Sequence, residues 1–227
     1  MIVGGIATIP SREHTLKLVL DSIVPQVTTL FVALNGYTEV PDWIHKTYNS
    51  DGFIHVTTIL NNNSKGDAMK FAMADIPDNL YFSFDDDLIY PENYCSYMLS
   101  KYKDHPKSII TLHGKVFSKP ITSSHRGIKE NYRCLNTVVG DHVVETGGTG
   151  VMMFNTNEVK VNLDMFNHPN MADIWMGKIA HEQNIPIVVV EHSAGWLQYI
   201  PQAKTIWGDH NREEDIYQAK VLNSYLK

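Results

Sequence analysis

Apolar and polar positions in the first half of the chain follow two alternating patterns. Short apolar runs typical of buried strands cover residues 2–7, 29–34, 53–60 and 81–84. The stretches between them predict helices at 11–24, 41–48 and 64–74, and Ser11 is a candidate N-cap of the first. Strands separated by helices indicate right-handed crossovers, and therefore an α/β fold with a mostly parallel central sheet flanked by helices.

The second half is less regular. We expect helices at residues 91–102, 171–183 and 213–225, and strands at 108–112, 151–154 and 185–190. Hairpin-like runs lie between residues 134 and 144. The sequence contains no internal repeat and no linker-like segment. At 227 residues the chain has a length typical of one domain, so we predict a single domain over residues 1–227.

Three consecutive carboxylates, Asp85-Asp86-Asp87, follow the aromatic strand at residues 81–84. Strand stability does not explain them, because adjacent like charges repel and each prefers water. A divalent cation held by Asp85 and Asp87 would neutralise them, and hard oxygen ligands suit Mg²⁺ or Mn²⁺ bound to substrate phosphates. The alternative is a solvated acidic turn that caps the helix beginning near Pro91.

Three more polar clusters follow predicted strands. They are Thr8-Ile9-Pro10, Asn35-Gly36 and Asn61-Asn62-Asn63. Ligands of parallel sheets bind beyond the carboxyl ends of the strands. All four clusters fall at that edge, so we expect them to converge on one ligand site.

Composition excludes some other functions. The net charge of -6 argues against a general nucleic-acid binder, which needs a basic surface. No signal peptide and no apolar run near 18 residues is visible, so we expect a cytoplasmic protein without a membrane span. Cys95 and Cys134 show neither metal-type nor redox-type spacing, which favours reduced thiols.

The order of these features resembles the GT-A glycosyltransferases, in particular family 2 and its relatives. Phe82-Ser83-Phe84-Asp85-Asp86-Asp87 resembles the strand that carries the family's D-x-D motif. The segment 148–154, Gly-Thr-Gly-Val-Met-Met-Phe, looks like the glycine-bearing segment beside the donor sugar. Residues 171–175 sit where the family places its acidic catalytic residue, although the usual Glu-Asp pair is here Ala172-Asp173.

The resemblance implies a single GT-A (Rossmann-like) domain, with a nucleotide-binding half at 1–90 and an acceptor-binding half at 91–227. It implies a glycosyltransferase, dependent on Mn²⁺ or Mg²⁺, that moves a sugar from a nucleotide-diphospho-sugar to a hydroxyl of a glycan or other acceptor. We expect a UDP-sugar donor and inversion at the anomeric carbon.

Two other functions compete with this one. A non-catalytic sugar-nucleotide or glycan-binding module could use the same fold. A nucleotidyltransferase is disfavoured, because its glycine-rich loop would stand at residues 7–12, which contain no glycine.

The resemblance also assigns roles to the acidic residues. Asp85 and Asp87 would hold the metal, while Asp86 would face the ribose or the sheet edge. Asp173 would be the general base that deprotonates the acceptor hydroxyl. The alternative for Asp173 is a helix cap that compensates the dipole.

Further residues are candidates for binding the nucleotide-sugar: Thr8, Arg12, Asn35, Asn63, Lys65, Asp85, Asp86 and Gly148. Several of these have plainer explanations. Arg12 could be a solvated arginine at a helix start, and Asn35 a turn residue. The stretch at 61–67 could be an ordinary helix start capped by Ser64.

The family often uses a late histidine as a third metal ligand. His192, after the strand at 185–190, is our first choice, with His210 or no histidine as alternatives. Trp196 and Trp207 are candidates for stacking on the acceptor, whereas Trp175 suits the core. We also expect the polar segment 120–132 to become ordered when the donor binds.

Overall fold

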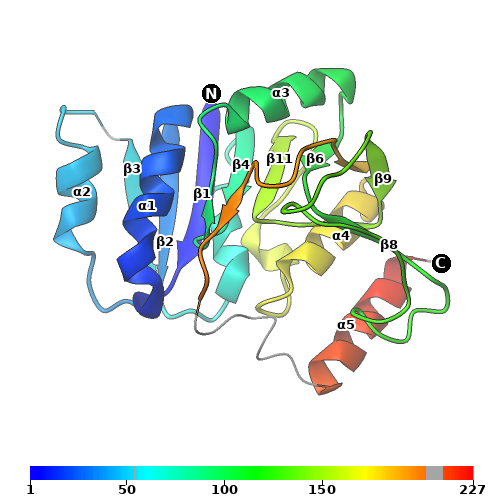
Figure 1. Cartoon of the computed structure of the whole chain (residues 1–227). Helices are drawn as coiled ribbons and strands as arrows, with labels where there is room; N and C mark the ends of the chain where they lie inside the picture. The colour runs from blue at the N-terminus through cyan, green and yellow to red at the C-terminus, as the bar shows by residue number, and fades with distance from the viewer. Residues whose placement is uncertain (54, 203–211, 227) are drawn as a thin grey trace.

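A central eight-stranded sheet with helices on both faces forms the body of the protein (Figure 1). The computed structural model describes residues 1–53, 55–202 and 212–226. The strand order in this sheet is β3-β2-β1-β4-β11-β6-β12-β9. Strands from both halves of the chain therefore lie in one sheet.

The first half of the chain forms the parallel part of the sheet. Its strands are β1 (Ile2–Thr8), β2 (Thr29–Asn35), β3 (Val56–Asn61) and β4 (Leu80–Phe84). Neighbouring strands in this part all pair in parallel. The connections contain α1 (Glu13–Ile23), α2 (Asp42–Tyr48) and the 3-10 helix η3 (Gly66–Phe71), with two shorter 3-10 helices, η1 (Pro10–Arg12) and η2 (Val24–Gln26). The four strands expected from the sequence are confirmed, and their carboxyl ends meet at one edge.

The second half makes the sheet mixed. β11 (Val151–Asn155) lies antiparallel between β4 and β6 (Ile109–Thr111). β12 (Ile187–Val189) pairs in parallel with β6, and β9 (His142–Val144) ends the sheet in antiparallel pairing. The prediction of a mostly parallel sheet thus holds for the first half, and β11 reverses the direction beside β4.

Two small sheets lie beside the main one. The first has the order β10-β7-β8, with β10 (Thr146–Gly147), β7 (Gly114–Phe117) and β8 (Ile128–Tyr132). The second pairs β5 (Leu88–Ile89) with β13 (Gln198–Tyr199). The hairpin is therefore β7–β8, and not the segment 134–144 that the sequence indicated. Part of the supposed loop 120–132 is the strand β8.

Alternating side chains of the sheet fill two apolar cores. Phe82 and Phe84 face the core under α1, α2 and α3 (Tyr94–Asp104). Tyr81 faces the opposite core, where it stacks on Phe71 and Phe154. That second core is covered by η3, α4 (Ala172–Glu182) and α5 (Arg212–Tyr225), with the 3-10 helix η4 (Leu163–Met165) close by. The alternation explains why β4 carries aromatic side chains on both faces.

One predicted helix takes a different form. Residues 64–74 were expected to be an α-helix, and the structure has the 3-10 helix η3 there. Asn63 and Gly66 both have positive φ, 62° and 56°, which prevents a regular helix from starting at Ser64. The tighter geometry turns Lys70 inward, where it is 4% exposed. This turn brings a charged side chain to the edge of the sheet.

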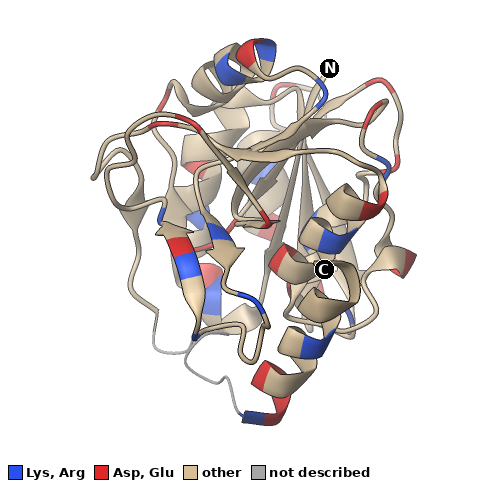
Figure 2. Ribbon diagram, turned by 90° about the vertical axis from the view of Figure 1, so that its right-hand side faces the viewer, with Lys and Arg blue, Asp and Glu red and all other residues tan. Residues whose placement is uncertain are grey.

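Charged residues of both signs are interspersed along the ribbon (Figure 2). The first turn of α5 is acidic, with Glu213, Glu214 and Asp215. Over the described ranges, we find no helix with the length and apolar character required to cross a membrane.

Candidate active site

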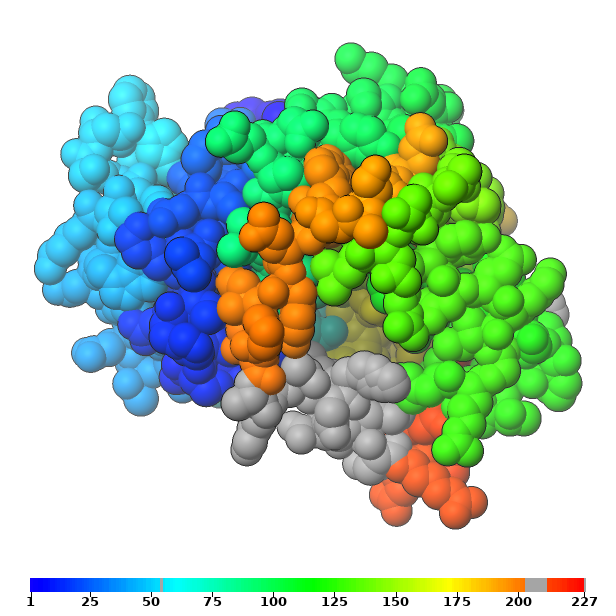
Figure 3. All heavy atoms as spheres, viewed as in Figure 1, coloured from blue at the N-terminus to red at the C-terminus, as the bar shows by residue number. Residues whose placement is uncertain are grey.

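Two adjoining cavities open at the carboxyl edge of β1, β2 and β4. The larger has a volume of about 700 Å³ and the smaller about 280 Å³. Arg12, Asp67, Lys70 and Asp85 line both, so the two cavities form one continuous cleft. Figure 3 shows this face hollowed between the orange segment that holds β13 and the green residues of the second half.

The smaller cavity brings together most of the residues predicted to bind the nucleotide-sugar. Thr8 from β1, Asn35 from β2, Asn63 and Asp86 line it, together with the shared Arg12 and Asp85. These residues come from four separate strand ends. The convergence expected from the sequence is therefore present in the structure.

The asparagines also build the wall of this cavity. The Asn35 amide nitrogen donates to the Gly66 carbonyl at 2.9 Å, and its Oδ1 accepts from Asn61 Nδ2 at 2.8 Å. The Asn63 backbone amide donates to Asn61 Oδ1 at 2.8 Å. Asn35 thus fixes the start of η3 against β2, which makes it more than a turn residue.

Lys65 lies elsewhere. Its ammonium donates to the carbonyls of Leu163 and Phe166, both at 3.1 Å, and it lines neither cavity. Lys65 therefore links η4 to the residues that precede η3. The structure does not place Lys65 where a phosphate of the cleft would meet it.

The three aspartates separate into different environments. Asp85 forms an ion pair with Lys70, and Asp86 forms one with Arg12. The Arg12 guanidinium also lies 3.5 Å from Asp87 Oδ2. Asp85 and Asp87 line the larger cavity, whereas Asp86 is 4% exposed and lines the smaller one. The outer two aspartates therefore share one cavity, as the D-x-D reading requires.

The carboxylate oxygens of Asp85 and Asp87 are suitable ligands for a hard divalent cation. Burial and then the charge of Asp85 raise the pKa of Asp87 to about 7, so a bound cation would stabilise its ionised form. The described residues contain no group of three or more His, Cys, Asp or Glu able to hold a metal ion. A cation here would therefore have two carboxylate ligands and complete its shell with phosphate and water.

Lys70 is a site residue that the sequence patterns did not single out. Burial lowers its pKa, but the charges of Asp85 and Asp67 outweigh burial and raise the pKa above its usual value. It therefore carries a permanent charge at the centre of the cleft. Its signal in the sequence is a lone lysine in the otherwise apolar run 68–74.

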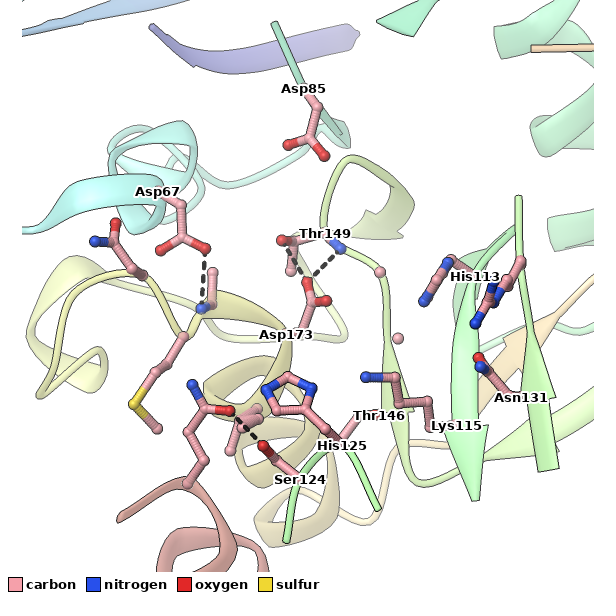
Figure 4. A pocket seen from close by; sticks show the side chains of 18 of the residues that line it. Asp67, Asp85, His113, Lys115, Ser124, His125, Asn131, Thr146, Thr149 and Asp173 are labelled. Atoms are coloured by element: carbon pink, nitrogen blue, oxygen red, sulfur yellow. Dashed lines mark hydrogen bonds between the residues drawn. The ribbon is translucent and has the colours of Figure 1, made fainter. Parts of the chain in front are cut away.

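Asp173 lies in the larger cavity at the start of α4. Its Oδ1 accepts hydrogen bonds from the Thr149 amide at 2.8 Å and from the Thr149 hydroxyl at 2.7 Å, as Figure 4 shows. Both bonds go to one oxygen. No hydrogen bond joins Oδ2 to a described residue, so this oxygen can accept from a ligand in the cavity.

The glycines on either side of Thr149 allow this close packing. A Cβ at Gly150 would lie 1.9 Å from Asp85 Oδ2, and one at Gly148 would lie 2.6 Å from the Cβ of His113. Gly148 lines the larger cavity, as predicted. The glycines therefore let the segment before β11 pass directly beside Asp85.

His192 does not reach the carboxylates of the cleft. It is 8% exposed and lines neither cavity. Its Nδ1 lies 2.7 Å from the Val190 carbonyl and its Nε2 3.4 Å from the Arg133 carbonyl. The expected role as a metal ligand is thus replaced by a structural one, since both ring nitrogens face backbone oxygens. His210 lies outside the described residues.

His113 and Lys115, which the sequence patterns did not single out, also line the larger cavity, together with Arg133. Their signal is a set of polar residues directly after the strand at 108–112 and at the end of β8. Together they form a basic wall of the larger cavity.

The tryptophans serve packing. Trp175 is 5% exposed and donates its indole N–H to the His168 carbonyl at 3.2 Å, which confirms its place in the core. Trp196 packs against Tyr94 and Tyr97 and lines neither cavity. The structure therefore does not bring Trp196 to the acceptor, and Trp207 lies outside the described residues.

No protein-family model matches the chain, and no curated protein does. Solved structures match over nearly its whole length. A crystal structure of Staphylococcus aureus TarS residues 1–349 in complex with UDP-GlcNAc has a TM-score of 0.66 and 12% identity, over 99% of this chain and 66% of that one. The same protein with UDP gives 0.54 and 13%, over 100% and 71%. A third TarS structure gives 0.53 and 13%, over 86% and 59%.

These likenesses establish the fold. The chain has the GT-A fold that the sequence predicted. It spans 59% to 71% of the length of the TarS chains that it matches.

Proposed function

We propose that the protein is a metal-dependent glycosyltransferase that moves a sugar from a UDP-sugar to a hydroxyl of a glycan or other acceptor, with inversion. One observation carries the proposal. Asp85 and Asp87 share a cavity with Asp173, whose Oδ1 is held by Thr149 while Oδ2 is left for a ligand. A TarS structure that holds UDP-GlcNAc has the same fold. A cytoplasmic location stays a prediction.

Each lobe of the cleft suits one part of the donor. The smaller cavity is lined by amide and hydroxyl groups from Thr8, Asn35 and Asn63, which suit a nucleoside. A Mn²⁺ or Mg²⁺ ion on Asp85 and Asp87 would stabilise the negative charge that develops on the departing diphosphate. Arg12 and Lys70 stand beside these carboxylates and add fixed positive charge at the same place.

Asp173 performs the acid–base step. The larger cavity has room for the transferred sugar and the acceptor hydroxyl. With Oδ1 bound to Thr149, Asp173 accepts the hydroxyl proton on Oδ2 as the acceptor oxygen attacks the anomeric carbon. The C–O bond to the diphosphate breaks on the opposite face, which gives inversion.

Ligand-dependent thermal stabilisation tests the proposal. A ligand that binds only the folded state raises the melting temperature by mass action. We expect UDP with Mn²⁺ to give a shift that GDP, CMP and dTDP do not match. Asp87→Ala should abolish the Mn²⁺-dependent part. Asp42→Ala, which removes an aspartate with an 86% exposed side chain on α2, should leave it intact.

Turnover separates an enzyme from a non-catalytic module on the same fold. Asp173→Asn should bind UDP as the native protein does but lose about 10²- to 10⁴-fold in sugar transfer. No shift with any nucleotide would overturn the proposed function. Nucleotide binding without transfer in the native protein would favour the binding module.

A further inference from the structure

One wall of the larger cavity is lined by basic side chains. Lys115 projects from β7 and Arg133 directly follows β8, and both line the cavity together with His113. Lys115 is paired in register with Asn131 of β8, which lines the same wall. The β7–β8 hairpin and the residues that flank it thus present a lysine, an arginine and a histidine to the interior of the cleft.

Lys115 has no direct ion-pair partner among the described residues. It is half-buried, and it forms no ion pair or hydrogen bond with the residues that the structure describes. Other cations near the cleft differ: Lys70 pairs with Asp85, and Lys119 lies 3.3 Å from Glu145. Burial is the largest factor and lowers the pKa of Lys115; the charge of Asp173 acts in the opposite direction, and the charge of Arg133 lowers the pKa further. An anion bound between these two side chains would relieve both effects.

This basic wall is separate from the site proposed for the diphosphate. In Figure 4, Asp173 lies between Asp85 and Lys115. Lys115 is therefore on the far side of the proposed general base from Asp85.

We infer that the acceptor carries an anionic group, a phosphate or a carboxylate, which binds Lys115 and Arg133 while a neighbouring hydroxyl reaches Asp173. The inference rests on the proposed function and names the acceptor class of the same site. A guanidinium and an ammonium on one strand pair suit an oxyanion, because both donate charge-assisted hydrogen bonds. A neutral acceptor would bring no negative charge to these two cations.

Calorimetric titration tests this inference on protein saturated with UDP and Mg²⁺, so that the diphosphate site is filled. The probes are glycerol 1-phosphate, glucuronate and, as neutral counterparts, glycerol and glucose. We expect one or both anions to bind and the neutral compounds not to. The anion that binds more tightly tells a phosphate-bearing acceptor from a carboxylate-bearing one.

Three variants locate the bound anion. Lys115→Met should weaken its binding by about tenfold or more, the effect of losing a hydrogen bond to a charged group, and Lys115→Arg should retain most of it. Lys129→Met is the matched control, because Lys129 lies on β8 with a 65% exposed side chain and does not line the cavity. UDP affinity should be equal in all three, which also shows that they fold.

Two results would overturn the inference. One is anion binding by the native protein that is no tighter than glycerol binding. The other is an equal loss in Lys115→Met and Lys129→Met, or no loss in either. Absence of UDP binding would instead contradict the proposed function, and titration of the same anions without UDP would still report on Lys115.

Discussion

Thr149 holds Asp173 through two hydrogen bonds to the same carboxylate oxygen, one from its amide at 2.8 Å and one from its hydroxyl at 2.7 Å. The two donors come from the segment before β11 and the acceptor from α4. This contact fixes which oxygen of Asp173 faces the cavity. It links the strand that borders Asp85 to the helix that carries the proposed base.

Thr149→Val removes the hydroxyl bond and keeps the amide bond. We expect kcat for sugar transfer to fall about tenfold, since a hydrogen bond to a charged group contributes about 1.5 to 3 kcal/mol and half of the pair remains. KM for the donor should not change. Thr149→Ser, which keeps the hydroxyl, should restore kcat. A loss in the serine variant equal to that in the valine variant would contradict a role for the hydroxyl.

Asp67 makes stability depend on pH. Burial, with a further contribution from the charge of Asp173, raises its pKa to about 6, and its Oδ2 accepts from the Ala172 amide at 3.2 Å. The folded state therefore binds this proton more tightly than the unfolded state, whose pKa is near 4. Below pH 4 both states hold the proton. Between about pH 4 and pH 6 only the folded state does, so this contribution to stability is lost as the pH rises, by about 2 to 3 kcal/mol.

Asp67→Asn should abolish this slope. Denaturant unfolding at intervals from pH 4 to pH 7.5 measures it, as the difference between native protein and variant. Asp164→Asn, an exposed aspartate of η4, is the control and should follow the native curve. A variant curve parallel to the native one would show that Asp67 does not titrate in this window.

Gly150→Ala should damage the metal site directly. The new Cβ would lie 1.9 Å from Asp85 Oδ2, so Asp85 must move away. We expect the Mn²⁺-dependent part of the UDP-induced thermal shift to disappear. Gly4→Ala places a Cβ 2.8 Å from core atoms of Leu30 and Phe84, and should lower the melting temperature while the UDP shift survives. Equal shifts in the two variants would contradict this account of Gly150.

His192→Gln should lower stability without changing the response to metal. Both ring nitrogens face backbone carbonyls, so the substitution disturbs the contacts with Val190 and Arg133. The Mn²⁺ concentration that gives half of the maximal UDP-induced shift should equal that of the native protein. A severalfold increase would restore His192 as a metal ligand.

The parts of the fold that could be predicted are those with strong local patterns. The strand at 81–84 and its carboxylates could be predicted because an apolar run ends in three adjacent charges that strand stability does not explain. The order of polar strand ends placed Thr8, Asn35 and Asn63 in one cavity, because parallel strands align their carboxyl ends.

Other features depend on tertiary contacts that leave little trace in local sequence. From the sequence alone, Lys70 would be expected on the surface of an amphipathic helix. In the structure, η3 turns it inward to Asp85. The β7–β8 hairpin was hidden because its strands are short and show no apolar-polar alternation: β8 reads Ile-Lys-Glu-Asn-Tyr and is partly exposed. The direction of β11 is likewise set by its partners, since antiparallel pairing with β4 places Gly150 beside Asp85.

The hydrogen-bonded pairing of β4 and β11 fixes the distance between two parts of the cleft wall. Phe84 is in register with Val151, so the residues that follow one strand and precede the other are neighbours on adjacent strands. Adjacent strands lie about 4.8 Å apart, and this spacing varies little in any sheet. The separation between Asp85 and the segment that holds Asp173 through Thr149 is thereby set by backbone geometry. Parting the two halves of the chain would break buried ladder bonds, so any opening for substrates must occur at the rim of the cleft.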